Sequence, residues 1–261
     1  MSALLNLLNE EFTLNANPAV LGTQRDRLVR KITANPDPYA KRKHLSNREA
    51  MEILRDVKDF VVKENSVQSR FRKACMCAIV GNVIEFDIPG HKFGYEDINR
   101  LVKNAESDLA IDETSRFFDL AKKRKTLVYL ADNAGEIAFD KLLVYELKKL
   151  GAYVTVAVKE GPALNDATVK DAEYVGMDEV ADDLVTTGAD AVGLIPEECS
   201  KEFLKIYDSA DLVVAKGMAY AETLTEFELN SPHVLLLRTK CNPVASYFHV
   251  SRDKNIAKIM P

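Results

Sequence analysis

The sequence predicts an α/β protein, because its two halves follow different patterns. Residues 1 to about 120 carry apolar side chains at helical spacing. From Lys125 onward, short apolar runs rich in β-branched residues alternate with amphipathic segments. Nearly continuous apolar strands separated by helices are typical of βαβ units, so we expect a mainly parallel sheet covered by helices on both faces.

The N-terminal half is predicted to be helical. Ser46 or Asn47 can cap a helix, because the apolar residues that follow recur every three or four positions. A buried helix is expected to end near Gly81 and Asn82. Two further helical patterns cover residues 95–107 and 112–125, and the proline-punctuated segment 35–39 is predicted to be a connector.

The C-terminal half is predicted to contain five strands. They cover residues 126–132, 152–159, 190–195, 211–217 and 233–240. Helical periodicity fills residues 141–151, 171–183, 199–210 and 222–229. Ligands of such sheets bind outside the carboxyl ends of the strands, so we expect the chemistry there.

Composition excludes several classes of protein. Lys and Arg number 35 against 40 Asp and Glu, and this net charge of -5 argues against a nucleic-acid binder. No run of 18 apolar residues predicts a membrane span, and the N-terminus lacks the features of a signal peptide. Four cysteines without paired spacing suit reduced thiols, so we expect a cytoplasmic protein. The sequence carries no signal of oligomeric state.

Oxygen-donor side chains follow the first two predicted strands. Asp132 and Asn133 come directly off the first strand, and Gly135 allows close backbone approach to a ligand before a helix opens near Glu136. Asp166, in the loop after the second strand, would complete a set of donors that suits Mg²⁺ or Mn²⁺. Each of these residues could alternatively cap a helix.

Two cations end the last two predicted strands, Lys216 and Lys240. Acids, an amide and two lysines at one edge of a sheet form the combination that phosphoryl chemistry requires. The sequence lacks the glycine-rich dinucleotide fingerprint, the P-loop and the nucleophile elbow. Cys75, Cys77 and His233 are predicted to be structural.

Six motifs together resemble a known family. They are Asn35-Pro36-Asp37-Pro38-Tyr39, Gly81-Asn82-Val83-Ile84-Glu85-Phe86, Asp132-Asn133-Ala134-Gly135-Glu136 with Asp140, Pro162 with Asn165-Asp166-Ala167-Thr168, the segment 211–217, and Lys240-Cys241 with Pro243-Val244-Ala245. In this order, over residues 35 to about 248, they resemble the metal-dependent damage-control phosphatases, especially the archaeal branch.

The resemblance implies a helical domain at residues 1–118 packed on a Rossmann-like α/β/α domain at residues 119–261. It implies one divalent cation (Mn²⁺, Co²⁺, Ni²⁺ or Mg²⁺) in the cleft, and a small phosphorylated metabolite, such as a sugar phosphate, as the substrate. By position, the metal ligands would be Asp132, Asn133 and Asp166.

The resemblance also assigns residues to the substrate. Asn82 and Glu136 would lie near the phosphate or the attacking water, and Lys216 and Lys240 would bind phosphate. Gly135 and Glu85 are expected to complete this site, with Glu85 standing where the family commonly has Asp. The segment 218–222 also departs from the family pattern, because the usual Asn after Lys-Gly is missing or displaced.

Two other functions remain alternatives at this point. One is an S-adenosylmethionine-dependent carboxyl methyltransferase, although residues 132–136 match its glycine-rich loop only weakly. The other is a non-enzymatic protein that binds a phosphorylated ligand. Release of phosphate with a divalent cation separates the phosphatase from both.

Overall fold

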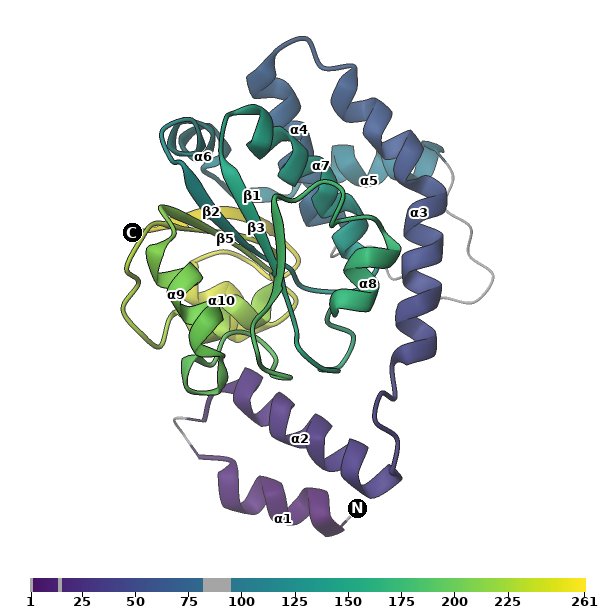
Figure 1. Cartoon of the computed structure of the whole chain (residues 1–261), viewed down its shortest axis with the longest axis vertical. Coiled ribbons are helices and arrows are strands. Elements are labelled where there is room, and N and C mark those ends of the chain that lie inside the picture. Colours follow the sequence, from purple (N-terminus) through teal and green to yellow (C-terminus); the bar gives the residue numbers. More distant parts are fainter. Residues whose placement is uncertain (1, 14–15, 82–94) are drawn as a thin grey trace.

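The fold was analysed in a computed structural model that describes residues 2–13, 16–81 and 95–261 (Figure 1). The helices are α1 (Ser2–Glu11), α2 (Pro18–Thr33), α3 (Ala40–Val62), α4 (Val67–Gly81), α5 (Tyr95–Ser107), α6 (Thr114–Ala121), α7 (Glu136–Lys149), α8 (Val169–Tyr174), α9 (Lys201–Ser209), α10 (Met218–Leu224) and α11 (Asn242–Tyr247), with a 3₁₀ turn at Pro196–Glu198. The strands are β1 (Leu109–Asp112), β2 (Thr126–Leu130), β3 (Tyr153–Val158), β4 (Asp183–Thr186), β5 (Leu212–Lys216), β6 (His233–Arg238) and β7 (Asn255–Met260). None of the helices in this described part is long and apolar enough to cross a bilayer.

The strands form one seven-stranded sheet in the order β1-β7-β6-β5-β2-β3-β4. The five strands from β6 to β4 are parallel to one another, while β7 runs antiparallel to β6 and β1 is parallel to β7. The prediction of an α/β fold with a mainly parallel sheet is therefore confirmed.

Helices cover both faces of the sheet because strand residues alternate between two apolar cores. In β2, Leu127 and Tyr129 face a core shared with α3 to α8, while Val128 and Leu130 face a second core shared with α9, α10 and α11. This period-two alternation with both sides apolar explains why the strands read as continuous hydrophobic runs.

The order of the strands reverses beside β2. From β2 the chain proceeds outward to β3 and β4, then returns to β5 on the other side of β2 and continues to β6. Such a switch point leaves a crevice at the carboxyl ends of the two diverging strands. Residues that follow β2 and β5 therefore lie where a ligand has access.

The structure corrects four expectations. Residues 190–195 are not a strand, and the strand between β3 and β5 is β4, which begins at the last residue of the segment 171–183 predicted to be helical. Gly193 has φ +72°, a conformation that an extended strand does not contain. Strand β1 lies in the half predicted to be helical throughout, and β7 had no predicted counterpart. Helix α3 begins at Ala40, so Ser46 and Asn47 lie inside it and cap nothing.

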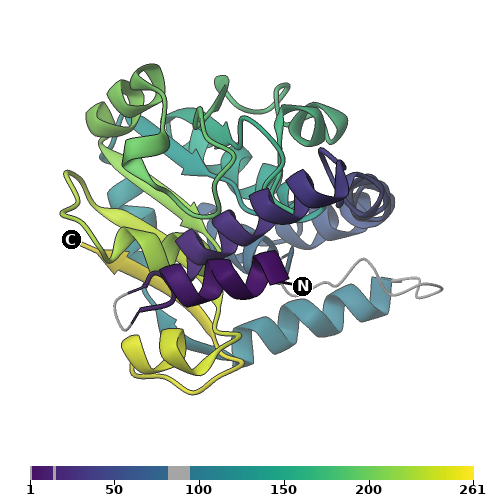
Figure 2. The ribbon, with the colours of Figure 1, turned by 90° about the horizontal axis from the view of Figure 1, so that it is seen from below.

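Helix α2 lies beside the loops at the carboxyl ends of the strands, and α1 lies on the other side of α2 (Figure 1, Figure 2). Ala19 of α2 packs with Ala163 and Val192, and the hydroxyl of Thr23 accepts a hydrogen bond from Val192 N at 2.9 Å. Arg30 pairs with Asp190 at 2.6 Å. The N-terminal segment is thereby fixed to the loops after β3 and β4.

Candidate active site

Backbone hydrogen bonds hold the acids after β2 and β3 side by side. Ala167 N donates to the carbonyl of Asp132 at 2.7 Å, and Ala134 N donates to the carbonyl of Asn165 at 2.9 Å. Between them, Asn133 and Asp166 form an isolated antiparallel bridge. The loop after β3 is thus hydrogen-bonded to the turn after β2, which brings together Asp132, Asn133 and Asp166 as the sequence predicted.

The side chain of Asn133 lies between two carboxylates. Its Nδ2 donates to Asp132 Oδ2 at 2.8 Å and to Glu136 Oε2 at 2.9 Å. Burial, with the nearby charges of Glu136 and Asp166, raises the pKa of Asp132 well above its usual range. Burial likewise raises the pKa of Asp166 to about 6, although the neighbouring Lys159 opposes the shift. Crowded carboxylates of this kind are stabilised by a cation.

Gly217, which follows β5, makes room for Asp132. Its φ is +83°, and a Cβ on it would stand 1.9 Å from Asp132 Oδ2. Any residue with a side chain would both strain this turn and displace the carboxylate. The end of β5 is therefore shaped around the acid that follows β2.

Lys216 is fully buried and binds protein oxygens. Its Nζ donates to Glu136 Oε1 and Asp140 Oδ1, each at 2.6 Å, and to the carbonyl of Ala78 at 2.9 Å. Burial lowers the pKa of an ammonium, but these two carboxylates outweigh it and raise the pKa of Lys216. In this structure Lys216 holds the first turn of α7 against β5, and its contact with phosphate stays a prediction.

Two residues that sequence reasoning missed also support the site. Asn47 of α3 accepts a hydrogen bond from Gly135 N at 2.7 Å and donates to Asp171 at 2.8 Å. Lys159, 1 % exposed at the end of β3, lies 3.7 Å from Asp166 and over the ring of Tyr220 at 4.6 Å. Lys159 lies at the end of a predicted strand as Lys216 does, and this position could have indicated its place at the site. No pattern in the sequence indicated the role of Asn47.

The structure describes some of the remaining predicted residues and not others. Lys240 is exposed after β6, and its charge opposes the rise in the pKa of Asp132 that burial causes. Asn82 and Glu85 lie outside the described residues. Cys75 and Cys77 are buried free thiols, and burial raises the pKa of Cys77 to about 12, which agrees with a structural role.

The acid cluster suits a divalent cation. Asp166 Oδ2 is buried and accepts no hydrogen bond, and the ammonium of Lys159 lies 3.7 Å from it, so this oxygen can still accept a further ligand. Two carboxylates and an amide oxygen are ligands that hard cations accept. In this structure Nδ2 of Asn133 points toward the carboxylates. Rotation of the amide by 180° about its last side-chain bond would place Oδ1 there instead, where it could bind a cation. Within the described part of the chain, no group of three His, Cys, Asp or Glu is placed to hold a metal, so this set depends on Asn133.

The fold and this site together define an α/β protein with a polar, acid-rich centre at the switch point of a mainly parallel sheet. Residues 1–256 match the model of the damage-control phosphatase ARMT1-like domain, and the chain belongs to this family.

Archaeal proteins are similar to this chain over nearly its full length. A damage-control phosphatase of Archaeoglobus fulgidus is 37% identical over 98% of this chain and 87% of its own length. An uncharacterized protein of Methanocaldococcus jannaschii is 38% identical, over 98% of this chain and 84% of its own length. A crystal structure of a DUF89 family protein from Pyrococcus horikoshii superposes with a TM-score of 0.86 at 31% identity, covering 98% of this chain and 87% of that one. The family that the motifs indicated is confirmed.

Proposed function

We propose that the chain is a metal-dependent phosphatase that hydrolyses a small phosphorylated metabolite. The observation that carries this proposal is the convergence of Asp132, Asn133 and Asp166 at the strand ends, with one buried carboxylate oxygen that accepts no hydrogen bond. Membership of a damage-control phosphatase family supports the same reaction class.

These three residues would hold the cation, which when bound neutralises phosphate oxygens and lowers the pKa of a water. Lys240, exposed after β6, would bind a phosphate oxygen. Glu136 is held by Lys216 at 2.6 Å, so its carboxylate is fixed next to Asn133, where it would orient the attacking water. Gly135 brings backbone close to the bound phosphate.

The test measures phosphate release from p-nitrophenyl phosphate and a panel of sugar phosphates. Chelator-stripped protein is compared with protein given Mn²⁺, Co²⁺, Ni²⁺ or Mg²⁺. Asp166→Ala should abolish release and weaken metal binding measured by calorimetry. Asp208→Ala, at an exposed aspartate of α9, is the matched control and should leave both unchanged.

The outcomes separate the alternatives. Binding of phosphate esters without turnover under any metal would indicate a binding protein. Binding of S-adenosylmethionine by metal-free protein would indicate the methyltransferase. Full activity of Asp166→Ala would refute the proposed ligand set.

A further inference from the structure

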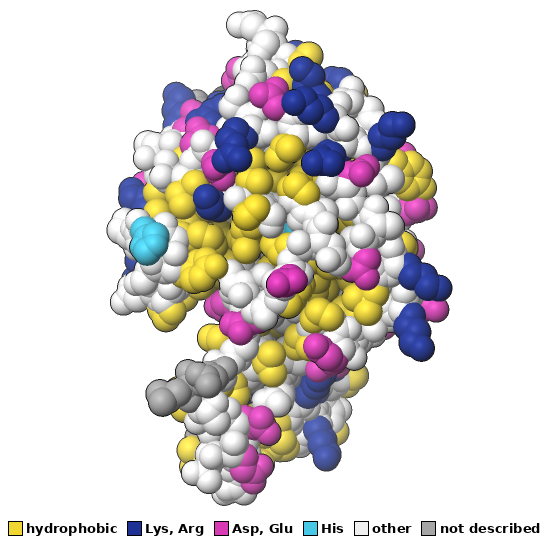
Figure 3. Space-filling view, turned by 90° about the vertical axis from the view of Figure 1, so that its left-hand side faces the viewer, with side chains coloured by type: hydrophobic (Ala, Val, Ile, Leu, Met, Phe, Trp, Pro, Cys, Tyr) yellow, Lys and Arg dark blue, Asp and Glu magenta, His cyan; other side chains and the backbone are white. Residues whose placement is uncertain are grey.

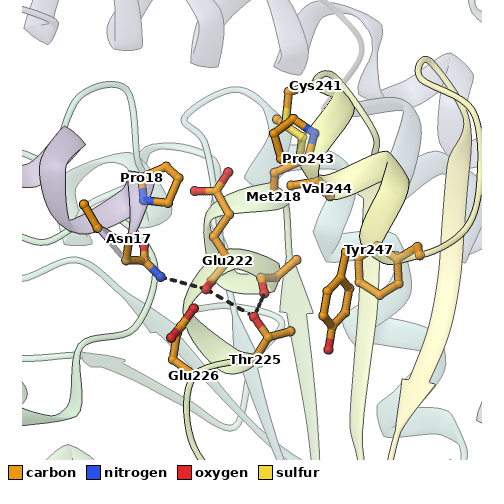
Figure 4. Close-up of a pocket in the computed structure, with 13 residues that line it drawn as sticks. Asn17, Pro18, Met218, Glu222, Thr225, Glu226, Cys241, Pro243, Val244 and Tyr247 are labelled. Atoms are coloured by element: carbon orange, nitrogen blue, oxygen red, sulfur yellow. Dashed lines mark hydrogen bonds between the residues drawn. The ribbon is translucent and has the colours of Figure 1, made fainter. Parts of the chain in front are cut away.

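A cavity of about 730 Å³ opens beside the candidate active site, at the carboxyl ends of β5 and β6 (Figure 4). Helices α10 and α11 form two of its walls, and residues 16–18, at the start of α2, close a third. Asn17 Nδ2 fixes this wall by donating to the carbonyl of Glu222 at 2.8 Å.

Two residues that line the cavity are sequence neighbours of residues at the candidate active site. Met218, which lines it, directly follows Gly217, the residue whose Cα packs against Asp132. Lys240 N donates to Met218 Sδ at 3.1 Å, and Cys241, the next residue, also lines the cavity. These contacts link the cavity lining to Gly217 beside Asp132 and to the segment that carries Lys240.

The cavity combines an apolar lining with two carboxylates. Val244, Tyr247 and Phe248 contribute apolar surface, and Glu222 and Glu226 are its charged residues. No lysine or arginine lines it in the part of the chain that the structure describes. In Figure 4 the carboxylate of Glu222 lies between Pro18 and Pro243, while Glu226 lies below it.

The surrounding surface has the same character. Figure 3 views the molecule from the side toward which α9 and α10 lie, where apolar side chains gather over the middle of the face. Acidic side chains lie along the lower border of this apolar area, above α1 and α2. A second phosphate on the substrate would meet like charge here, and a cation would meet opposite charge.

We propose that this cavity binds the organic part of the substrate and selects phosphate monoesters that carry an amino group on an apolar body and no second phosphate. The proposal rests on the proposed phosphatase function. In it the ammonium pairs with Glu222, with Glu226 adding negative potential, and the apolar body lies against Val244 and Tyr247.

The test uses substrates that differ only in charge. Pyridoxamine 5′-phosphate and pyridoxine 5′-phosphate share an apolar ring and differ by an amine in place of a hydroxyl. Glucosamine 6-phosphate against glucose 6-phosphate repeats the comparison on a sugar. We expect kcat/KM about tenfold higher for each amine, the factor that one close ion pair between substrate and protein supplies. Fructose 1,6-bisphosphate should be turned over at least tenfold less efficiently than fructose 1-phosphate, because its second phosphate meets two carboxylates.

Variants assign the preference to the cavity. Glu222→Gln should reduce the amine preference to about twofold or less, with Glu226→Gln intermediate, because each removes one negative charge. Glu228→Gln, at an exposed glutamate outside the lining, is the matched control and should keep the tenfold ratio. Ala221→Phe, which fills the cavity from α10, should depress turnover of the ring-bearing substrates more than that of glycerol phosphate.

Equal kcat/KM for amine and hydroxyl partners in the wild type would overturn the proposal, as would a preference that survives both glutamine variants. Absence of phosphate release from p-nitrophenyl phosphate under every metal would instead overturn the proposed function. In that event calorimetric binding of pyridoxamine 5′-phosphate against pyridoxine 5′-phosphate still decides the cavity, since the ion pair contributes to affinity without turnover.

Discussion

Replacing Gly217 by alanine should cause a large loss of phosphatase activity with only a small loss of stability. Gly217 has φ +83° and ψ 173°, a region essentially restricted to glycine, and a residue with a side chain there costs about 1–3 kcal/mol. The new Cβ would also stand 1.9 Å from Asp132 Oδ2, whereas ordinary contacts begin near 3.4 Å. The carboxylate must therefore move by about 1.5 Å, and a displacement of about 1 Å in a catalytic site costs roughly 100-fold in rate.

The expected result is a loss of at least about 100-fold in metal-dependent phosphate release, together with weaker metal binding by calorimetry. The free energy of unfolding, from denaturant titration, should fall by only about 1–3 kcal/mol. Asp132 is affected directly because its carboxylate is the group that the added methyl displaces.

Two glycines provide matched controls. Gly151 has φ +94° and nothing within 4 Å of a built Cβ, so Gly151→Ala introduces backbone strain without a clash. Gly22 lies in α2 and also has open space, so Gly22→Ala should be neutral or stabilise by about 0.5–1 kcal/mol. Both should retain activity. A Gly217→Ala protein with wild-type metal affinity and turnover would refute the placement of Asp132 in the site.

Three further substitutions test the surroundings of the site. Lys216→Met leaves the buried carboxylates of Glu136 and Asp140 without their cation, so the free energy of unfolding should fall by about 3–5 kcal/mol. Urea titration measures this change, and an unchanged midpoint would contradict the ion pairs. Asn47→Ala leaves the buried Gly135 N–H without its acceptor, so the free energy of unfolding should fall by about 1–3 kcal/mol. Hydrogen exchange of the Gly135 amide should become faster, and an unchanged exchange rate would show that the hydrogen bond is dispensable. Burial lowers the pKa of His233, despite an opposing hydrogen bond to a backbone carbonyl, so the native ring stays neutral where the unfolded chain takes up a proton. The contribution of His233 to stability should therefore be lost as the pH falls below the unfolded value of about 6.5, and His233→Gln should remove that contribution from the pH dependence of thermal unfolding across pH 5–8; an identical pH dependence would rule out a role for His233.

The centre of the site was predictable because it follows from a rule about sheets. Asp132 and Asp166 come after apolar runs that could only be buried parallel strands, and the carboxyl ends of such strands meet at one edge. The roles of the supporting residues were not predictable in the same way. Asn47 had the local pattern of a helix cap, and its partner Gly135 is 88 residues away in sequence.

The errors in the fold also have physical reasons. The segment 190–195 has the apolar composition of a strand, but tertiary contacts place its backbone in turns, with Val192 N bound to Thr23 and Leu194 N bound to Thr223. The true edge strand β4 has only four residues and is half-buried, so it leaves little apolar signal. Lys216 looked like a surface charge that could meet phosphate, because a sequence does not show that two acids of α7 enclose it.

The position of β7 between β6 and β1 has a consequence for the synthesis of the chain. Leu109 in β1 pairs with Asn255 in β7, 146 residues later, and β1 has no other neighbour in the sheet. At about 5–20 residues per second, translation takes roughly 7–30 s to cover that interval. Throughout this time β1 is without the strand that it pairs with, and β6, once formed, presents an open hydrogen-bonding edge until β7 follows it. Completion of the sheet is therefore delayed until residues 255–260 have been synthesised, and deletion of these residues would remove the strand that joins its two parts.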